Sequence, residues 1–374
     1  MASTFSFGFS GDDIDMDDSE LNGVDEGNAS VAQENSNPHP EPLAARRHNL
    51  DEFISSLPSQ ISYNKLQIST SQDERSSEKT LTLARREVFD IRTQLMAEDT
   101  ADYENEELIS GLEKGDITPL VYEGGFKTWE CALDLAKLVT SENIASDADA
   151  EDGHIIELGA GTAVPSLALF AQLLSKPEGS PKTAHFTFAD YNSVVLRLVT
   201  FPNLLLTWNY VLTRQKSVSV AGEEDQAEHE EEELDITPEL LQSFRADIAK
   251  RGITIEFISG AWSPAFADLV FSSGDSAKGR ALVLASETIY SPASLSAFSE
   301  TLLALLRRPA QVGGKSRALV AAKKVYFGVG GGVDEFLAVF NTVGGSELDV
   351  KERLDIKSEG VGRIVLEIAP NNLA

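Results

Sequence analysis

The sequence has little cysteine and histidine, which excludes two classes of site. Cys131 is the single cysteine among 374 residues, so the chain has neither an internal disulfide nor a cysteine zinc cluster. The five histidines show no metal-ligand spacing. We therefore expect no metal centre.

The sequence also lacks the pattern of a secretory signal and a run of about eighteen apolar residues that could span a bilayer. It begins MASTFSFGFSGDDIDMDD, without a basic stretch followed by an apolar one. We expect a protein of the cytoplasm, the nucleus or both, with no membrane partner.

Basic residues are missing from two acidic stretches. Met1 to Pro42 holds ten acidic residues and Glu223 to Asp235 holds nine, and neither contains Lys or Arg. These nineteen account for most of the net charge of −29. Such segments repel themselves and bury little apolar surface, so we expect disorder over residues 1–50 and in an insert at about 220–236. The charge disfavours direct nucleic-acid binding and favours a basic partner.

Residues 51–116 predict a partly helical extension, and residues 117–374 the main domain. Within the extension, Thr80 to Ala97 places four apolar residues near helical spacing and predicts one amphipathic helix. These residues are Leu83, Val88, Ile91 and Leu95.

Five short apolar stretches alternate with helical patterns in the main domain. They begin at His154, His185, Thr254, Ala281 and Ala318. Strands separated by helices predict an α/β fold with a parallel, doubly wound sheet. Two further strand-like stretches, about Glu347 to Leu354 and Gly362 to Ile368, predict an antiparallel hairpin at its edge.

The stretch HIIELGAGTAVPSLALF, from His154 to Phe170, predicts a strand, a glycine turn and a helix that together hold a nucleotide. A dinucleotide fingerprint needs a third glycine where this chain has Val164. Glu157 precedes Gly159 and Gly161, and its carboxylate is unfavourable beside a pyrophosphate but favourable beside a sulfonium. The turn therefore indicates S-adenosylmethionine, which is cationic and lacks phosphate.

Asp190 ends the next predicted strand. An acid at this place in a doubly wound fold can accept both ribose hydroxyls in charge-assisted hydrogen bonds. The spacing from Gly159 exceeds the usual ~20 residues, and the intervening loop SKPEGSPK can absorb the difference.

Six phrases, in order along the chain, resemble the seven-strand methyltransferases that methylate histidine in proteins. They are VYEGGFKTWEC, IIELGAGTAVPSLAL, FADYNSVVLRLVTFPN, GAWS, SETIYS and YFGVGGGVDEF. The resemblance spans about Ile117 to Ile368 and is strongest to fungal enzymes that modify a histidine of a large-subunit ribosomal protein. It implies a Rossmann-like class I methyltransferase fold with a seven-stranded, mostly parallel sheet and a C-terminal antiparallel hairpin.

Carried over by position, the resemblance implies that S-adenosylmethionine contacts residues from five segments. These are Lys127, Thr128, Trp129, Glu130 and Cys131; Gly159; Asp190, Tyr191 and Asn192; Gly260, Ala261 and Trp262; and Ser286. The two tryptophans are flat enough to cover the cofactor, and each is also compatible with a place in the core.

SETIYS follows the fourth strand, where the reacting methyl is expected, and it supplies Glu287 and Tyr290 as candidate catalytic residues. A neutral imidazole needs no strong base, only the correct tautomer and near in-line placement. An acceptor for the other ring N–H selects that tautomer. The glycines from Gly328 to Gly332 lack a following Lys-Ser/Thr, so they favour a wall of the acceptor pocket or a plain connection over a phosphate loop.

The resemblance thus implies an enzyme that methylates the tele nitrogen of a histidine in a basic, large-subunit ribosomal protein, and we expect it to be a monomer. Two alternatives remain open at this point. One is a protein-lysine methyltransferase on the same scaffold. The other is a noncatalytic acidic adaptor or chaperone for a basic ribosomal protein, which an intact set of Glu157, Gly159, Gly161 and Asp190 disfavours.

Overall fold

The computed structural model describes residues 42–69, 80–98, 124–142, 153–176, 183–218, 232–272, 279–357 and 360–371. The predicted disorder of residues 1–50 lies outside these ranges up to residue 41, as does the acidic insert up to residue 231. The prediction is wrong for its last residues, since Arg46–His48 form a strand and a helix begins at Leu50. Residues 42–374 form one unit of contacts. The predicted domain boundary at residue 117 stays a prediction.

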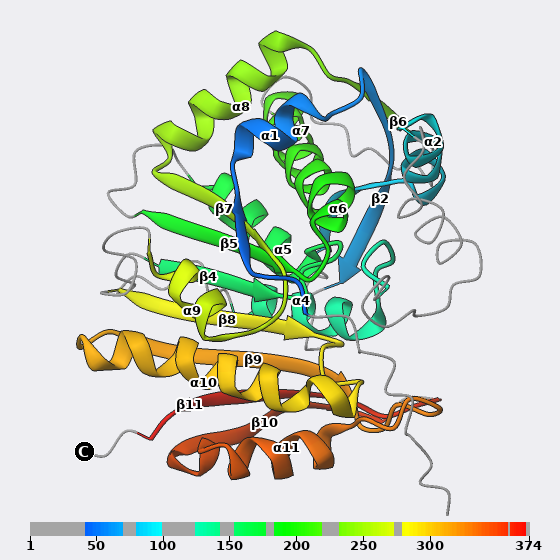
Figure 1. The fold of residues 1–374 in the computed structure, drawn as a ribbon. Coiled ribbons are helices and arrows are strands. Elements are labelled where there is room, and N and C mark those ends of the chain that lie inside the picture. The colour runs from blue at the N-terminus through cyan, green and yellow to red at the C-terminus, as the bar shows by residue number, and fades with distance from the viewer. Residues whose placement is uncertain are drawn as a thin grey trace, which may run out of the picture. The chain divides into compact units, whose positions relative to one another are not determined.

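A mixed sheet of eight strands runs through this unit in the order β1-β7-β5-β4-β8-β9-β11-β10 (Figure 1). Five strands are parallel, namely β4 (Gly153–Leu158), β5 (Ala184–Asp190), β7 (Ile253–Ser259), β8 (Arg280–Ser286) and β9 (Lys315–Lys323). The predicted hairpin follows as β10 (Leu348–Ile356) and β11 (Arg363–Pro370). The predicted Rossmann-like α/β fold is confirmed. Short strand β1 (Arg46–His48) adds an eighth strand, antiparallel to β7.

Helices cover both faces of this sheet and bury two apolar cores. One face packs on α4 (Glu130–Ser141), α5 (Val164–Leu174), α7 (Phe201–Val218) and α8 (Pro238–Lys250). The other packs on α9 (Pro264–Val270), α10 (Leu295–Gln311) and α11 (Val333–Thr342), which lie toward the viewer in Figure 1. Successive side chains of a strand point to opposite faces of the sheet. Because helices bury both faces, nearly every residue of these strands is apolar.

The predicted single helix over Thr80 to Ala97 is wrong in its first half. Residues Thr80–Arg86 form strand β3, and helix α2 (Val88–Glu98) follows. β3 pairs with β2 (Gln60–Ser69) in register over seven residues, from Ser69↔Thr80 to Tyr63↔Arg86. This pairing joins segments that local helical spacing cannot detect.

The end of the acidic insert is also ordered, contrary to the expected disorder up to residue 236. Glu232–Asp235 forms strand β6, which pairs with β2. Glu232 lies 2.5 Å from Lys65 Nζ and accepts a 2.5 Å hydrogen bond from the Tyr63 hydroxyl. Pairing with β2 therefore neutralises part of the acidic sequence.

A continuous helical stretch after β5 comprises α6 (Ser193–Val195), the π-helical turn η2 (Leu196–Thr200) and α7. Contrary to the sequence-based expectation, residues Ser193–Gln215 are long and apolar enough to cross a membrane by length and composition alone. In this fold 72% of the apolar window is buried. The stretch is the central helix of the first core.

Short elements complete the described chain. They are α1 (Leu50–Ser55), η4 (Pro292–Ser294) and η5 (Gly345–Glu347).

Candidate active site

The predicted site residues meet at the carboxyl ends of β4, β5, β7 and β8. Strand order reverses between β4 and β8, and ligands of open α/β sheets bind beside such a reversal. The two strand ends are close there, since a Cβ built on Gly159 after β4 would lie 2.8 Å from Thr288 Cγ2 after β8.

The glycine turn needs both of its predicted glycines. Gly159 has φ +63° and Gly161 has φ +49°, a left-handed conformation that costs glycine little. A Cβ on Gly161 would also lie 3.1 Å from the carbonyl oxygen of Gly125. The Thr200 hydroxyl, in the π-helical turn η2, donates a 2.7 Å hydrogen bond to the Gly161 carbonyl. Thr200, which is distant in sequence from the glycine turn, therefore helps to hold the turn in place.

Glu157 lies beneath this turn rather than on an open surface. Its side chain is buried, and Oε2 accepts a 3.0 Å hydrogen bond from the backbone N–H of Ser166 in the first turn of α5. The residue before α5, Ala163, has no capping side chain, so Glu157 supplies the missing acceptor. Burial raises the pKa of Glu157 to about 8. Oε1 has no hydrogen-bond partner among the described residues.

Asp190 holds the corner between β5 and α6. Its two carboxylate oxygens accept hydrogen bonds from the backbone N–H of Gly161 at 3.0 Å and of Asn192 at 3.1 Å. Asn192 in turn caps α6, since its side chain accepts from Val194 N–H at 2.8 Å. A carboxylate has about four lone-pair sites, so Asp190 can accept ribose hydroxyls in addition.

The predicted adenine segment follows β7. Gly260 has φ +109° and donates its N–H to the carbonyls of Asp190 and Tyr191, both at 3.1 Å. Residues before β1 pack directly on this segment: Ala261 N–H donates to the Leu43 carbonyl at 2.9 Å, and a Cβ on Gly260 would lie 2.6 Å from the Ala44 carbonyl oxygen. Residues 43–45 fall in the segment expected to be disordered, and no motif indicated that they lie against Gly260 and Ala261.

Trp262 and Trp129 are both partly buried. The Trp262 ring lies 5.0 Å from Phe298 in the second core. Trp129 is the residue before α4 and donates its Nε1–H to the Gly124 carbonyl at 3.0 Å. Each indole thus packs on one side and keeps some exposed surface.

Thr128 connects the segment before α4 to the glycine turn. Its hydroxyl donates to Thr162 Oγ1 at 3.0 Å and accepts from Arg85 on β3 at 3.1 Å. Lys127 and Glu130 are exposed, whereas the Cys131 thiol is buried. Burial, with the charge of Glu287 nearby, raises the Cys131 pKa above its ordinary value, which keeps the thiol neutral.

Ser286 ends β8, and Glu287 follows in a left-handed conformation, φ +56°. Such a backbone is costly outside glycine and often marks a functional position. The Glu287 side chain is 9% exposed and lies 3.9 Å from Lys323 Nζ. Its Oε1 has no hydrogen-bond partner within the described part of the chain. The carboxylate is thus held at the end of β8 near Lys323, with a buried oxygen that accepts no hydrogen bond from the described residues.

Tyr326, which the sequence did not single out, joins the two candidate catalytic residues. Burial and the charge of Glu287 raise the pKa of Tyr326 above its ordinary value, the phenol oxygen accepts a 3.2 Å hydrogen bond from the Lys323 N–H, and the ring lies 6.3 Å from that of Tyr290. The two aromatic rings and the carboxylate form one wall beyond the end of β8.

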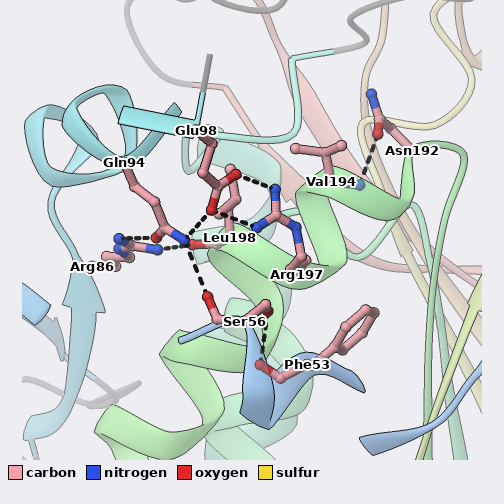
Figure 2. A network of polar contacts seen from close by, with 9 residues as sticks. All are labelled: Phe53, Ser56, Arg86, Gln94, Glu98, Asn192, Val194, Arg197 and Leu198. Atoms are coloured by element: carbon pink, nitrogen blue, oxygen red, sulfur yellow. Dashed lines mark hydrogen bonds and ion pairs between the residues drawn. The ribbon is translucent and has the colours of Figure 1, made fainter. Parts of the chain in front are cut away.

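A buried polar network supports the site from the side of β3 and α2 (Figure 2). Arg86 donates to the Leu198 carbonyl in the π-helical turn at 3.0 Å, to Gln94 at 2.7 Å and to Asp90 at 2.6 Å. The Arg86 N–H also donates to Asn203, whose amide donates to the Thr162 carbonyl at 3.1 Å. β3 therefore reaches the glycine turn through Arg86 as well as through Arg85.

The residues present fit a cationic nucleoside without phosphate. The turn from Gly159 to Val164 carries no Lys or Arg, and two acidic side chains lie against it, Asp190 and the buried Glu157, whose raised pKa keeps it largely protonated near neutral pH. Oε1 of Glu157 has no hydrogen-bond partner in the part of the chain that the structure describes. A pyrophosphate would face the negative charge of Asp190 here, with no Lys or Arg in the turn to offset it.

Comparison with known proteins decides the family. Histidine protein methyltransferase 1 of Saccharomyces cerevisiae is 37% identical over 299 residues, 77% of each chain. The chain belongs to the histidine protein methyltransferase family. A histidine protein methyltransferase 1 of Schizosaccharomyces pombe is 34% identical over the full chain and 96% of its own length, and a Bos taurus homologue is 33% identical over 68% of this chain and 57% of its own.

No protein-family model matches this histidine protein methyltransferase. Among solved structures, the rRNA methyltransferase AviRa from Streptomyces viridochromogenes has a TM-score of 0.34 and 13% identity, over 66% of this chain and 88% of its own. The chain is a protein-histidine N-methyltransferase, and S-adenosylmethionine is its methyl donor.

Proposed function

We propose that this enzyme transfers a methyl group to the tele nitrogen of a histidine in a large-subunit ribosomal protein. Family membership supports histidine as the acceptor. The placement of Glu287 supports the choice of nitrogen, and the acidic composition supports a basic protein as substrate.

The observation that carries the proposal is Oε1 of Glu287 at the end of β8, which accepts no hydrogen bond from another described residue and lies 3.9 Å from Lys323 Nζ. A neutral imidazole has one nitrogen that donates and one that accepts. When Glu287 accepts the N–H of Nδ1, the lone pair remains on Nε2, the tele nitrogen. The carboxylate thereby selects the tautomer and orients the ring.

Bound S-adenosylmethionine supplies an electrophilic methyl on a sulfonium. The protein's own contribution is placement: the Asp190 corner and the glycine turn fix one partner, and Glu287 with Tyr290 orients the other. Holding the reacting atoms about 3 to 3.5 Å apart in line provides most of the rate gain available to such a transfer. Burial and the ammonium of Lys323, 3.9 Å away, keep the Glu287 carboxylate in place before the acceptor arrives.

A basic acceptor fits the charge of the chain, since −29 attracts positively charged proteins at low salt. We further propose that the enzyme acts as a monomer, binds no nucleic acid directly, and works in the cytoplasm, the nucleus or both. Each of these proposals follows from the composition and from the nature of the acceptor.

The proposal is tested by incubating the enzyme with labelled S-adenosylmethionine and dissociated large-subunit ribosomal proteins, with histones as an equally basic control. We expect label in a ribosomal protein and none in the histones. Label in histones alone would contradict the proposed substrate.

A further inference from the structure

Three exposed apolar side chains lie within five residues of one another after β9. Phe327 is 78% exposed, Val325 49% and Val329 47%. We call these three residues the apolar ridge. Aromatic side chains this exposed are typical of protein interfaces, where they fill a pocket of the partner.

The ridge stands on a closed turn. Tyr326 N–H donates to the Gly331 carbonyl at 3.0 Å, Gly330 N–H donates to the Tyr326 carbonyl at 3.2 Å, and Val325 forms an antiparallel bridge with Gly332. Tyr326 is half-buried, with its hydroxyl on the Lys323 N–H at 3.2 Å and its ring 6.3 Å from that of Tyr290, whereas its neighbours Val325 and Phe327 are exposed. The apolar side chains are therefore displayed by a turn whose backbone is already paired.

The same turn contacts the candidate catalytic segment. A Cβ on Gly331 would lie 2.2 Å from the Tyr290 carbonyl oxygen, so the two backbones touch and only glycine fits. Pro292, just beyond Tyr290, lies 3.7 Å from a Cβ built on Gly330. The ridge therefore lies on a turn that is in direct contact with the segment carrying Tyr290.

The charge next to the ridge identifies the kind of partner. Asp334 and Glu335 open α11 immediately after the turn; both are exposed, and neither forms an ion pair with another described residue. An apolar ridge followed by two free carboxylates complements a basic segment that carries an apolar side chain. A basic acceptor protein has this chemistry.

We propose that the apolar ridge is the docking surface for the protein acceptor, which places an apolar side chain on Phe327 and basic side chains toward Asp334 and Glu335. This inference rests on the proposed function. It adds a specificity surface outside the cofactor site and outside Glu287 and Tyr290.

The test compares two phenylalanines of equal exposure. Phe327→Ala removes the centre of the ridge, and Phe89→Ala removes a side chain on α2 that is also 78% exposed. Initial rates of methyl transfer to dissociated large-subunit ribosomal proteins are measured against acceptor concentration, and the Kd for S-adenosylmethionine by calorimetry. We expect Phe327→Ala to raise the acceptor KM roughly tenfold, as truncation of an interface aromatic does, with the cofactor Kd unchanged. Phe89→Ala should change neither.

A second pair of variants tests whether the effect belongs to the ridge as a whole and not only to Phe327. Val329→Ala should raise the acceptor KM, whereas Val312→Ala, at a residue 55% exposed after α10, should not. An unchanged KM for Phe327→Ala, or an equal rise for Phe89→Ala, overturns the docking surface while the proposed function stands. Absence of transfer by the wild-type enzyme overturns the proposed acceptor, and the docking surface with it.

Discussion

Arg86 on β3 donates a 3.0 Å hydrogen bond to the carbonyl of Leu198, inside the π-helical turn η2 that follows the Asp190 corner and α6. A π-helical turn lacks some of the regular i→i−4 bonds and so leaves carbonyls that need another donor. The Arg86 side chain is 1% exposed and pairs with Asp90 at 2.6 Å. One buried guanidinium thus joins the N-terminal elements to the turn that carries Thr200.

Arg86→Met should lower the free energy of unfolding by about 3 kcal/mol, because it leaves a largely buried carboxylate and a carbonyl without their donor. It should also weaken S-adenosylmethionine binding, since Thr200 supports Gly161 from the same turn. Urea denaturation and calorimetry measure the two effects.

The matched control is Arg197→Gln, which breaks the pair between Arg197 and Glu98 near the surface. This change should cost less than about 1 kcal/mol. Equal stability losses for the two variants would contradict the role assigned to Arg86.

Asp190→Asn should weaken S-adenosylmethionine binding by roughly tenfold to a hundredfold, because a charge-assisted hydrogen bond is worth about 1.5 to 3 kcal/mol. The asparagine keeps one oxygen acceptor for the Gly161 or Asn192 N–H, so the corner is less disturbed than by alanine. Calorimetry with adenosine and with free adenine separates the ribose contribution. An affinity for S-adenosylmethionine equal to that of the wild type would remove Asp190 from the ribose site.

Glu157 should make the protein less stable as pH rises toward 8. Its folded-state pKa, about 8, exceeds the ordinary value of 4.5, so the folded state binds more protons than the unfolded state between these values. Stability therefore falls with rising pH over this window. Burial lowers the pKa of His154 from 6.5 to about 3. This group therefore changes the free energy of unfolding mainly between pH 3 and pH 6.5, below the range of interest for Glu157.

Between pH 6.5 and 8 the wild type should lose about 2 kcal/mol of unfolding free energy through this group. Glu157→Gln, which keeps an oxygen for the Ser166 N–H, should not show that loss. Parallel pH profiles for the two proteins in urea denaturation would contradict a raised pKa of Glu157.

Glu287→Gln should lower kcat by about a hundredfold, because the amide orients an imidazole less strongly than a buried carboxylate. The cofactor Kd should not change. Tyr290→Phe removes only a hydroxyl and should have the smaller effect if Glu287 holds the ring N–H. The reverse order of kcat values would assign that role to Tyr290.

The glycine turn, the position of Asp190 at the end of a strand and the individual strands of the parallel sheet were predictable, because each is encoded by residues adjacent in sequence. Gly159 and Gly161 do have the positive φ that the motif predicted. The sequence correctly predicted that Glu157 precedes the glycine turn. Its hydrogen bond to the Ser166 N–H was not predictable, because it depends on a helix whose N-cap residue, Ala163, has no side chain that can accept a hydrogen bond.

The parts that escaped prediction depend on pairing between distant segments. The sequence of β3 has helical spacing, and only its pairing with β2 makes it a strand. The sequence of β6 is typical of a disordered segment, and only the contacts of Glu232 with Lys65 and Tyr63 show why it is ordered. Residues 43–45 have no motif, yet the left-handed Gly260 makes room for their backbone. Tyr326 lay inside a motif already quoted for resemblance, and only the fold shows its phenol beside Glu287.

The central claim is methyl transfer to the tele nitrogen of histidine in a large-subunit ribosomal protein. Its most direct test is acid hydrolysis of the labelled ribosomal protein, followed by separation of tele-methylhistidine, pros-methylhistidine and methyl-lysine. We predict that the label co-migrates with tele-methylhistidine. Label found only in pros-methylhistidine or only in methyl-lysine would contradict the claim.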